Sequence, residues 1–128
     1  MRVLFFCPFN FDIKSSNLDR LGGIETLNYE LAKKLSENKN NEIFIATLSN
    51  KKIINKRLTN IPIKYLDNKN YNFDIIISSN YSKIFDKFPK AKNYLWLHNT
   101  LAIEKALRKK ILFSILFNKV TALFVSNY

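Results

Sequence analysis

The stretch Leu21-Gly22-Gly23-Ile24-Glu25-Thr26-Leu27, which continues as far as Leu35, is the segment on which the predicted fold depends. It begins with the only two glycines in the chain. The residues after them follow a helical pattern, with apolar side chains on one face and charged side chains away from it. The predicted apolar face holds Ile24, Leu27, Leu31, Ala32 and Leu35, whereas Glu25, Lys33 and Lys34 are expected to point away from it.

The segment before the glycine pair adds a strand to this helix. A buried strand is predicted over residues 2–7, because its residues 3–7 form an apolar run, and the order is strand, loop, glycine pair, helix. A helix N-terminus favours an anion because its first N–H groups are unpaired, and glycines let a ligand approach the backbone. Gly22 and Gly23 are therefore candidates for binding phosphate. The alternative is that they only turn the chain into the helix, where Glu25 is interpreted as a charge partner of the helix dipole.

Strands and helices are predicted to alternate along the rest of the chain. Residues 49–60 are expected to be irregular, a short helix is predicted within 79–88, and a long one over 101–118. Pro62 predicts that its strand lies at a sheet edge. Further strands are predicted over residues 42–48, 61–65, 73–78, 93–98 and 122–125.

This alternation predicts an α/β fold: a Rossmann-like open parallel sheet with helices on both faces. Ligands of such sheets gather beyond the carboxyl ends of the strands. Polar residues that follow those ends, including Asn10, Asn80, His98 and Asn99, are candidates for binding a ligand there. The loop over residues 8–20 is long for this position, which is typical of a functional loop. Arg20 at its end is interpreted either as a contact for an acceptor phosphate or as a solvated charge.

His98 is the only histidine in the chain and follows a predicted strand. A neutral imidazole can donate or accept a hydrogen bond to a sugar hydroxyl, and the alternative is a purely structural role. No metal site is expected, because neither the cysteine nor a carboxylate is spaced to join His98. The chain lacks the G-x-G-x-x-G and G-K-[ST] patterns, which disfavours an ordinary NAD enzyme and an ordinary ATPase.

The composition suits a single domain of 128 residues, and the formal net charge is +11. This charge favours polyanionic partners, although a bias towards lysine and asparagine codons is an alternative cause. No RNA-recognition motif is legible, so nucleic acid is not expected as a partner. The basic helix predicted over 101–118 is interpreted either as a crossover helix with a solvated face or as a membrane-surface helix. A single cysteine, Cys7, and no visible signal peptide or membrane span favour the cytoplasm.

Four segments together carry a family resemblance. They are Met1-Arg2-Val3-Leu4, Gly22-Gly23-Ile24-Glu25-Thr26, Trp96-Leu97-His98-Asn99 and Ala122-Leu123-Phe124-Val125-Ser126-Asn127-Tyr128. In this order and spacing the chain resembles the N-terminal domain of retaining GT-B glycosyltransferases of the family-four type. The resemblance covers essentially the whole chain.

The resemblance implies two Rossmann-like domains that face each other across a cleft. The N-terminal domain would bind a glycan or lipid acceptor, as in the making of a cell-envelope polysaccharide, and the other domain would hold the nucleotide sugar. Gly22 and Gly23 would approach the donor diphosphate, and His98 would be the catalytic residue that contacts the transferred sugar. Asn10, Arg20, Asn80 and Asn99 are the candidates for the acceptor. No metal or other cofactor is implied, and the anomeric configuration is retained through electrostatic stabilisation of the leaving group.

The chain also departs from this family. The C-terminal domain with its paired glutamates is missing, and the helix expected after Ser126 is absent. This chain alone, without its C-terminal domain or a partner subunit, is therefore expected to be inactive. It is interpreted either as a fragment of a longer enzyme or as a standalone half with another job. The alternatives are a non-catalytic basic module that docks on a partner or on the inner face of the membrane, and a different GT-B enzyme such as a nucleotide-sugar epimerase.

Overall fold

The computed structural model describes residues 1–14, 21–68, 70–98 and 118–124. Arg20, Asn99, almost all of the predicted helix over 101–118 and the segment 126–128 lie outside this described part. The described elements, in chain order, are β1 (Arg2–Phe6), α1 (Gly23–Ser36), β2 (Glu42–Thr47), β3 (Ile53–Asn55), β4 (Leu58–Pro62), η2 (Ile63–Asp67), β5 (Ile75–Ser79), η3 (Lys83–Lys87), β6 (Lys92–Leu97) and β7 (Thr121–Phe124).

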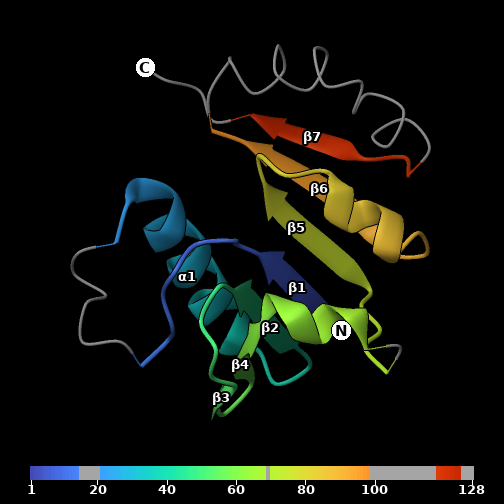
Figure 1. Cartoon of the computed structure of the whole chain (residues 1–128). Helices are drawn as coiled ribbons and strands as arrows, with labels where there is room; N and C mark the ends of the chain where they lie inside the picture. Colours follow the sequence, from blue (N-terminus) through green and yellow to red (C-terminus); the bar gives the residue numbers. More distant parts are fainter. Residues whose placement is uncertain (15–20, 69, 99–117, 125–128) are drawn as a thin grey trace.

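The described strands form one seven-stranded sheet in the order β3-β4-β2-β1-β5-β6-β7. It runs from β3 at the bottom of Figure 1 to β7 near the top. All neighbouring pairs are parallel except β3 with β4. Without β3, the six parallel strands follow the order 3-2-1-4-5-6 of doubly wound sheets, which reverses direction between β1 and β5. The Rossmann-like α/β fold predicted from the sequence is therefore confirmed.

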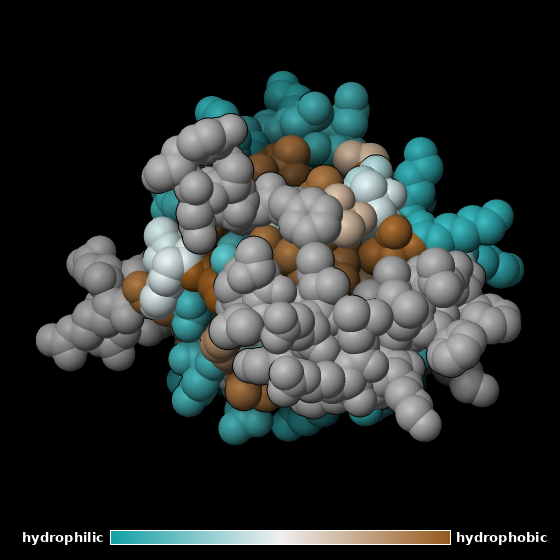
Figure 2. Space-filling model, turned by 90° about the horizontal axis from the view of Figure 1, so that it is seen from above, coloured by the Kyte–Doolittle hydropathy of each residue, from teal (hydrophilic) through white to brown (hydrophobic). Residues whose placement is uncertain are grey.

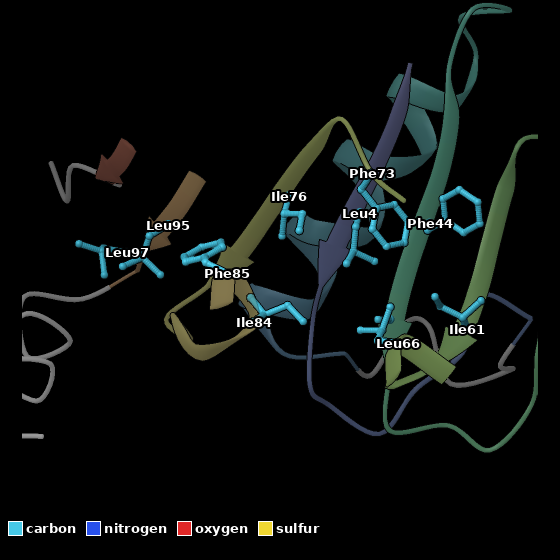
Figure 3. Close-up of a cluster of buried hydrophobic side chains, with 11 residues drawn as sticks. Leu4, Phe44, Ile61, Leu66, Phe73, Ile76, Ile84, Phe85, Leu95 and Leu97 are labelled. Carbon is cyan, nitrogen blue, oxygen red and sulfur yellow. The ribbon is translucent and has the colours of Figure 1, made fainter. Parts of the chain in front are cut away.

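Alternate residues of the central strands fill two separate cores, one on each face of the sheet. Leu4 of β1 belongs to the core that η2 and η3 cover through Leu66 and Phe85 (Figure 3). Val3 and Phe5 belong to the core on the other face, which α1 covers. Strands buried on both faces need apolar side chains at successive positions, which explains the unbroken run at the start of the chain.

Helix α1 has the predicted bounds within two residues, but its buried face is rotated from the predicted one. Asn28 and Ala32 are fully buried against the sheet, whereas Leu27 and Leu31 are 45% and 37% exposed. Asn28 and Ala32 lie one turn apart, on the most completely buried line of the helix. Leu27 and Leu31 both lie on one side of this line, so counting apolar residues alone centred the predicted contact too far towards them.

Two predictions about the strands between residues 49 and 65 are wrong. Residues 53–55, expected to be irregular, form the edge strand β3, which pairs antiparallel with β4. The strand predicted over 61–65 lies over Leu58–Pro62, and η2 follows it. Pro62 does not mark an edge strand: it is the last residue of β4, beyond the part that pairs with β3, so its missing N–H breaks no bond there.

Among the described residues that are visible from above, apolar ones lie between the grey parts near the centre of the view, and hydrophilic ones lie mostly at its rim (Figure 2). Leu123 of the edge strand β7 is 40% exposed. Within the part of the chain that the structure describes, no helix is both long and apolar enough to cross a membrane.

Candidate functional site

The candidate site lies at the carboxyl ends of β1, β5 and β6, beside the N-terminus of α1. The strand order reverses between β1 and β5, so the connections leaving these two strands diverge to opposite faces of the sheet. Gly22 opens the helix that follows β1, and Asn80 directly follows β5. His98 comes one residue after β6, the next strand in the sheet. The fold thus brings the glycine pair, Asn80 and His98 to one edge of the sheet.

The N-terminus of α1 keeps free backbone donors. Gly22 is its N-cap residue, with no side-chain cap, and its carbonyl accepts the first helical bond from the Thr26 amide at 3.0 Å. Among the described residues, no acceptor is found for the amides of Gly23, Ile24 or Glu25. Three such amides at the positive end of a helix form a site that favours an oxyanion.

The two glycines differ in what surrounds them. A Cβ on Gly22 would lie 2.6 Å from Oε2 of Glu25, whose side chain folds back over the N-cap, whereas a Cβ on Gly23 would meet no described atom within 4 Å. Neither glycine has a positive φ angle. Packing within the described part and backbone conformation therefore do not require glycine at position 23, and no described atom fills the space above it.

Asn28 connects α1 to the end of β5. Its side chain is fully buried, and its Nδ2 donates to the Ile24 carbonyl at 2.8 Å and to Ser79 Oγ at 2.9 Å. The Ile24 carbonyl can only accept, so it fixes which end of the amide faces it. Asn28 thereby connects α1, which follows β1, to β5. These two parts lie on opposite sides of the point where the strand order reverses.

Ser79 continues this connection to His98. Its hydroxyl is fully buried and lies 3.1 Å from His98 Nε2. Since Ser79 Oγ already accepts from Asn28, its proton is available for Nε2, which favours the neutral imidazole with its proton on Nδ1. Partial burial of the ring lowers the pKa of His98 from its usual value of 6.5, which favours the same neutral form. The Nδ1–H is then a donor that a ligand oxygen can accept from.

Asn80 makes hydrogen bonds to the backbone of both Trp96 and His98. It adopts a left-handed conformation with φ of 61°, which asparagine tolerates better than most residues. Its amide donates to the Trp96 carbonyl at 3.0 Å, and its Oδ1 accepts from the His98 amide at 3.2 Å. The ring of Trp96 lies beside that of His98, with centroids 4.8 Å apart. Asn80 therefore positions His98, whereas its predicted contact with an acceptor stays a prediction.

The described part of the loop after β1, residues 7–14, provides less of a binding surface than the sequence suggested. Asn10 is exposed there, but the neighbouring Phe9 carbonyl accepts from the Leu48 amide, on the β2 side of β1 and away from His98. Phe11 and Ile13 are each only 5% exposed and fill the core beneath α1. The apolar residues of this loop are therefore explained by packing, and the acceptor roles of Asn10, Arg20 and Asn99 stay predictions.

Cys7, directly after β1, is buried beneath this site. Burial raises the pKa of its thiol to about 12, and the nearby Glu25 carboxylate contributes in the same direction. A neutral buried thiol is neither a nucleophile nor a metal ligand at physiological pH. Within the described ranges, no group of three or more His, Cys, Asp or Glu side chains is placed to hold a metal ion.

Two parts of the site were not anticipated from the sequence. Ser79 directly precedes Asn80 at the predicted sheet edge, but its contacts with Asn28 and His98 were not foreseen. Asn28 itself was missed, although it lies four residues from both Ile24 and Ala32, within the apolar face of α1. A polar residue at such a position is the signal that could have found it, because a buried amide needs a partner on the element that covers it.

Comparison of the chain with protein-family models, with curated proteins and with solved structures gave no significant match.

Proposed function

We propose that this chain is the acceptor-side domain of a retaining glycosyltransferase that uses a nucleotide sugar. In this proposal the free amides at the start of α1 receive the diphosphate of the donor. The neutral His98 donates from Nδ1 to a hydroxyl of the transferred sugar. The acceptor is a glycan or lipid, and a second domain or a partner subunit supplies the pocket for the nucleotide.

One observation carries this proposal. The hydrogen bonds from Asn28 to Ser79 and from Ser79 to His98 connect the glycine helix with the histidine, although 75 residues separate Gly23 from His98 in the chain. A glycine pair that merely turned the chain would not need a histidine held at the same edge. A donor with a sugar on a diphosphate, in contrast, needs an anion site and a sugar contact close together.

The chemistry that these groups support is electrostatic. Negative charge develops on the diphosphate when the bond to the sugar breaks, and oriented amide dipoles stabilise such a charge without having to reorganise. The helix dipole adds to this effect within the first turn. No nucleophile from the protein is needed, and the buried Cys7 is not available as one.

The test is sugar transfer by the protein as its gene encodes it. Radiolabelled UDP-sugars and GDP-sugars are supplied with glycan and lipid extracts as acceptors. We expect Gly23→Val to lower turnover at least a hundredfold, because its side chain occupies the space through which the diphosphate must approach. We expect Gly23→Ala, whose methyl group meets no described atom, to lower turnover less while the protein stays folded.

Thr26→Val is the matched control, because it changes an exposed side chain of the same helix and leaves the first amides in place. Its turnover should equal that of the unmodified protein. Transfer that is equally fast in Gly23→Val would remove the diphosphate from the helix N-terminus. An absence of transfer with every donor, together with salt-sensitive binding to anionic vesicles, would favour the non-catalytic docking module instead.

A further inference from the structure

Tyr81 is an exposed aromatic residue at the same sheet edge as His98, and it makes none of the contacts proposed for the donor. It lies two residues after the end of β5 and is 47% exposed. The chain around it is packed: Ser82 is buried, and Ile84 and Phe85 of η3 lie in the apolar core (Figure 3). Tyr81 therefore extends from a connection that is anchored to the sheet.

The backbone and the ring of Tyr81 are both held in place. Its carbonyl accepts a hydrogen bond from Ser78 Oγ, and the amide of the preceding Asn80 donates to the Trp96 carbonyl at 3.0 Å. Its ring meets that of Phe6, at the end of β1, edge to face, with centroids 6.5 Å apart. A side chain that is already ordered loses little conformational entropy when a ligand packs on it. Tyr81 is thus an exposed ring that is prepared for contact.

Asn80 adds a hydrogen-bond donor between Tyr81 and His98. Its Oδ1 accepts from the His98 amide at 3.2 Å, and because an N–H group only donates, this contact fixes the orientation of the side chain. Nδ2 therefore points away from that amide, and it has no acceptor among the described residues. It is not one of the unpaired atoms that are sealed from solvent, so a ligand can reach it.

An aromatic ring beside an accessible amide donor fits a pyranose. A pyranose has C–H bonds on one face and hydroxyl groups at its rim. The C–H bonds pack against the negative face of an aromatic ring, and the hydroxyl oxygens accept from an amide. A prenyl chain would use the ring of Tyr81 but leave Nδ2 of Asn80 without an acceptor. We propose that Tyr81 and Asn80 bind a sugar ring of the acceptor, which makes the acceptor a carbohydrate rather than a bare lipid phosphate.

This inference rests on the proposed glycosyltransferase function, and it places the acceptor beside the donor. Phe6 packs against the core on the η3 side of the sheet, whereas Ser79 faces α1 through its contact with Asn28. Asn80 follows Ser79 and precedes Tyr81. An acceptor sugar on Tyr81 and a donor beside His98 would therefore approach each other over Asn80, at the carboxyl edge of the sheet.

Titration with methyl glycosides, followed by NMR, tests the sugar contact without a transfer reaction. The probes are the methyl glycosides of glucose, galactose, mannose and N-acetylglucosamine. We expect at least one of them to shift both the Asn80 side-chain amide and the Tyr81 ring, with a dissociation constant of about 10 mM. The Gly23 amide should stay unchanged, because these glycosides carry no phosphate. Tyr81→Ala should weaken binding about fivefold, whereas Tyr81→Phe keeps the ring and should stay within about twofold.

Two further variants separate a sugar contact from a purely structural role. Asn80→Asp keeps the oxygen that accepts from the His98 amide but loses the Nδ2 donor, and it should weaken glycoside binding about threefold. Tyr65→Ala removes another exposed ring, on η2, and should leave glycoside binding unchanged.

The proposal is overturned if none of the four glycosides shifts Tyr81 at about 100 mM, or if Tyr81→Ala binds them equally well. Shifts of Tyr81 with farnesyl phosphate or with uridine, but with no glycoside, would assign the ring to a lipid or to a nucleobase and would also overturn it. In the transfer reaction, Tyr81→Ala should raise the acceptor KM about fivefold and leave the donor KM unchanged. Because glycoside binding is measured without a donor, its failure and the failure of the proposed transfer reaction are distinguishable.

Discussion

Asn28 and Asn93 are two buried asparagines at opposite edges of the same sheet, and their surroundings differ. Asn28 lies at the carboxyl edge, where Nδ2 has two acceptors from α1 and β5. Asn93 lies at the amino edge, where neither Oδ1 nor Nδ2 has a hydrogen-bond partner among the residues that the structure describes. The first amide joins two elements and orders the candidate active site. The second makes no such connection among the described residues, so its burial is unfavourable to the folded state.

This comparison makes opposite predictions for the two positions, and the larger effect is expected at Asn28. Asn28→Ala should lower the free energy of unfolding by about 2 kcal/mol, because it removes two hydrogen bonds and leaves a small cavity in a closed interface. Urea denaturation followed by circular dichroism measures this change. A loss below about 0.5 kcal/mol would mean that Asn28 does not hold α1 to β5.

The effect at Asn93 should be smaller and of the opposite sign. Asn93→Leu should raise the free energy of unfolding by about 0.5 to 1 kcal/mol, since an unpaired buried amide is replaced by an apolar group of similar shape. The same urea experiment measures this change. A strong destabilisation would show that the amide of Asn93 already has a structural partner, and the contrast with Asn28 would disappear.

The smallest effect concerns the protonation of His98. Because burial lowers its pKa, the folded protein binds fewer protons than the unfolded chain below pH 6.5. Stability should therefore fall as the pH drops through 6.5 and level off below the folded pKa. His98→Gln should lack this component, which a comparison of both proteins at pH 7.5 and 5.5 isolates. Since His98 is the only histidine, its ring signal in the NMR spectrum also gives the pKa directly, and a value at or above 6.5 would contradict the neutral state derived from Ser79.

Much of the fold was predictable because each strand carries its own local signal. The central strands are buried on both faces and read as apolar runs, so β1, β2 and β5 were located within one or two residues. The edge strand β3 was missed since it has only three residues and two of them are exposed. The buried face of α1 was misplaced, because the sequence does not show which line of the helix approaches the sheet most closely.

The sequence predicted where the candidate site lies, but not the hydrogen bonds that connect its residues. Strand ends and the glycine pair identified the correct sheet edge, because parallel strands bring their carboxyl ends together. The contacts of Ser79 with Asn28 and His98 depend on side-chain directions of three elements that are distant in sequence. The unpaired state of Asn93 is likewise visible only once its neighbours in space are known.

The most direct measurement of the central claim is a titration of the protein with uridine diphosphate and with guanosine diphosphate, followed by NMR. If α1 and His98 act on one donor, then the Gly23 amide and the His98 ring should shift together with at least one of these nucleotides, with the same dissociation constant, and Gly23→Val should abolish both shifts. Gly23 and His98 signals that stay unchanged with both nucleotides would contradict a diphosphate site at the carboxyl edge of the sheet.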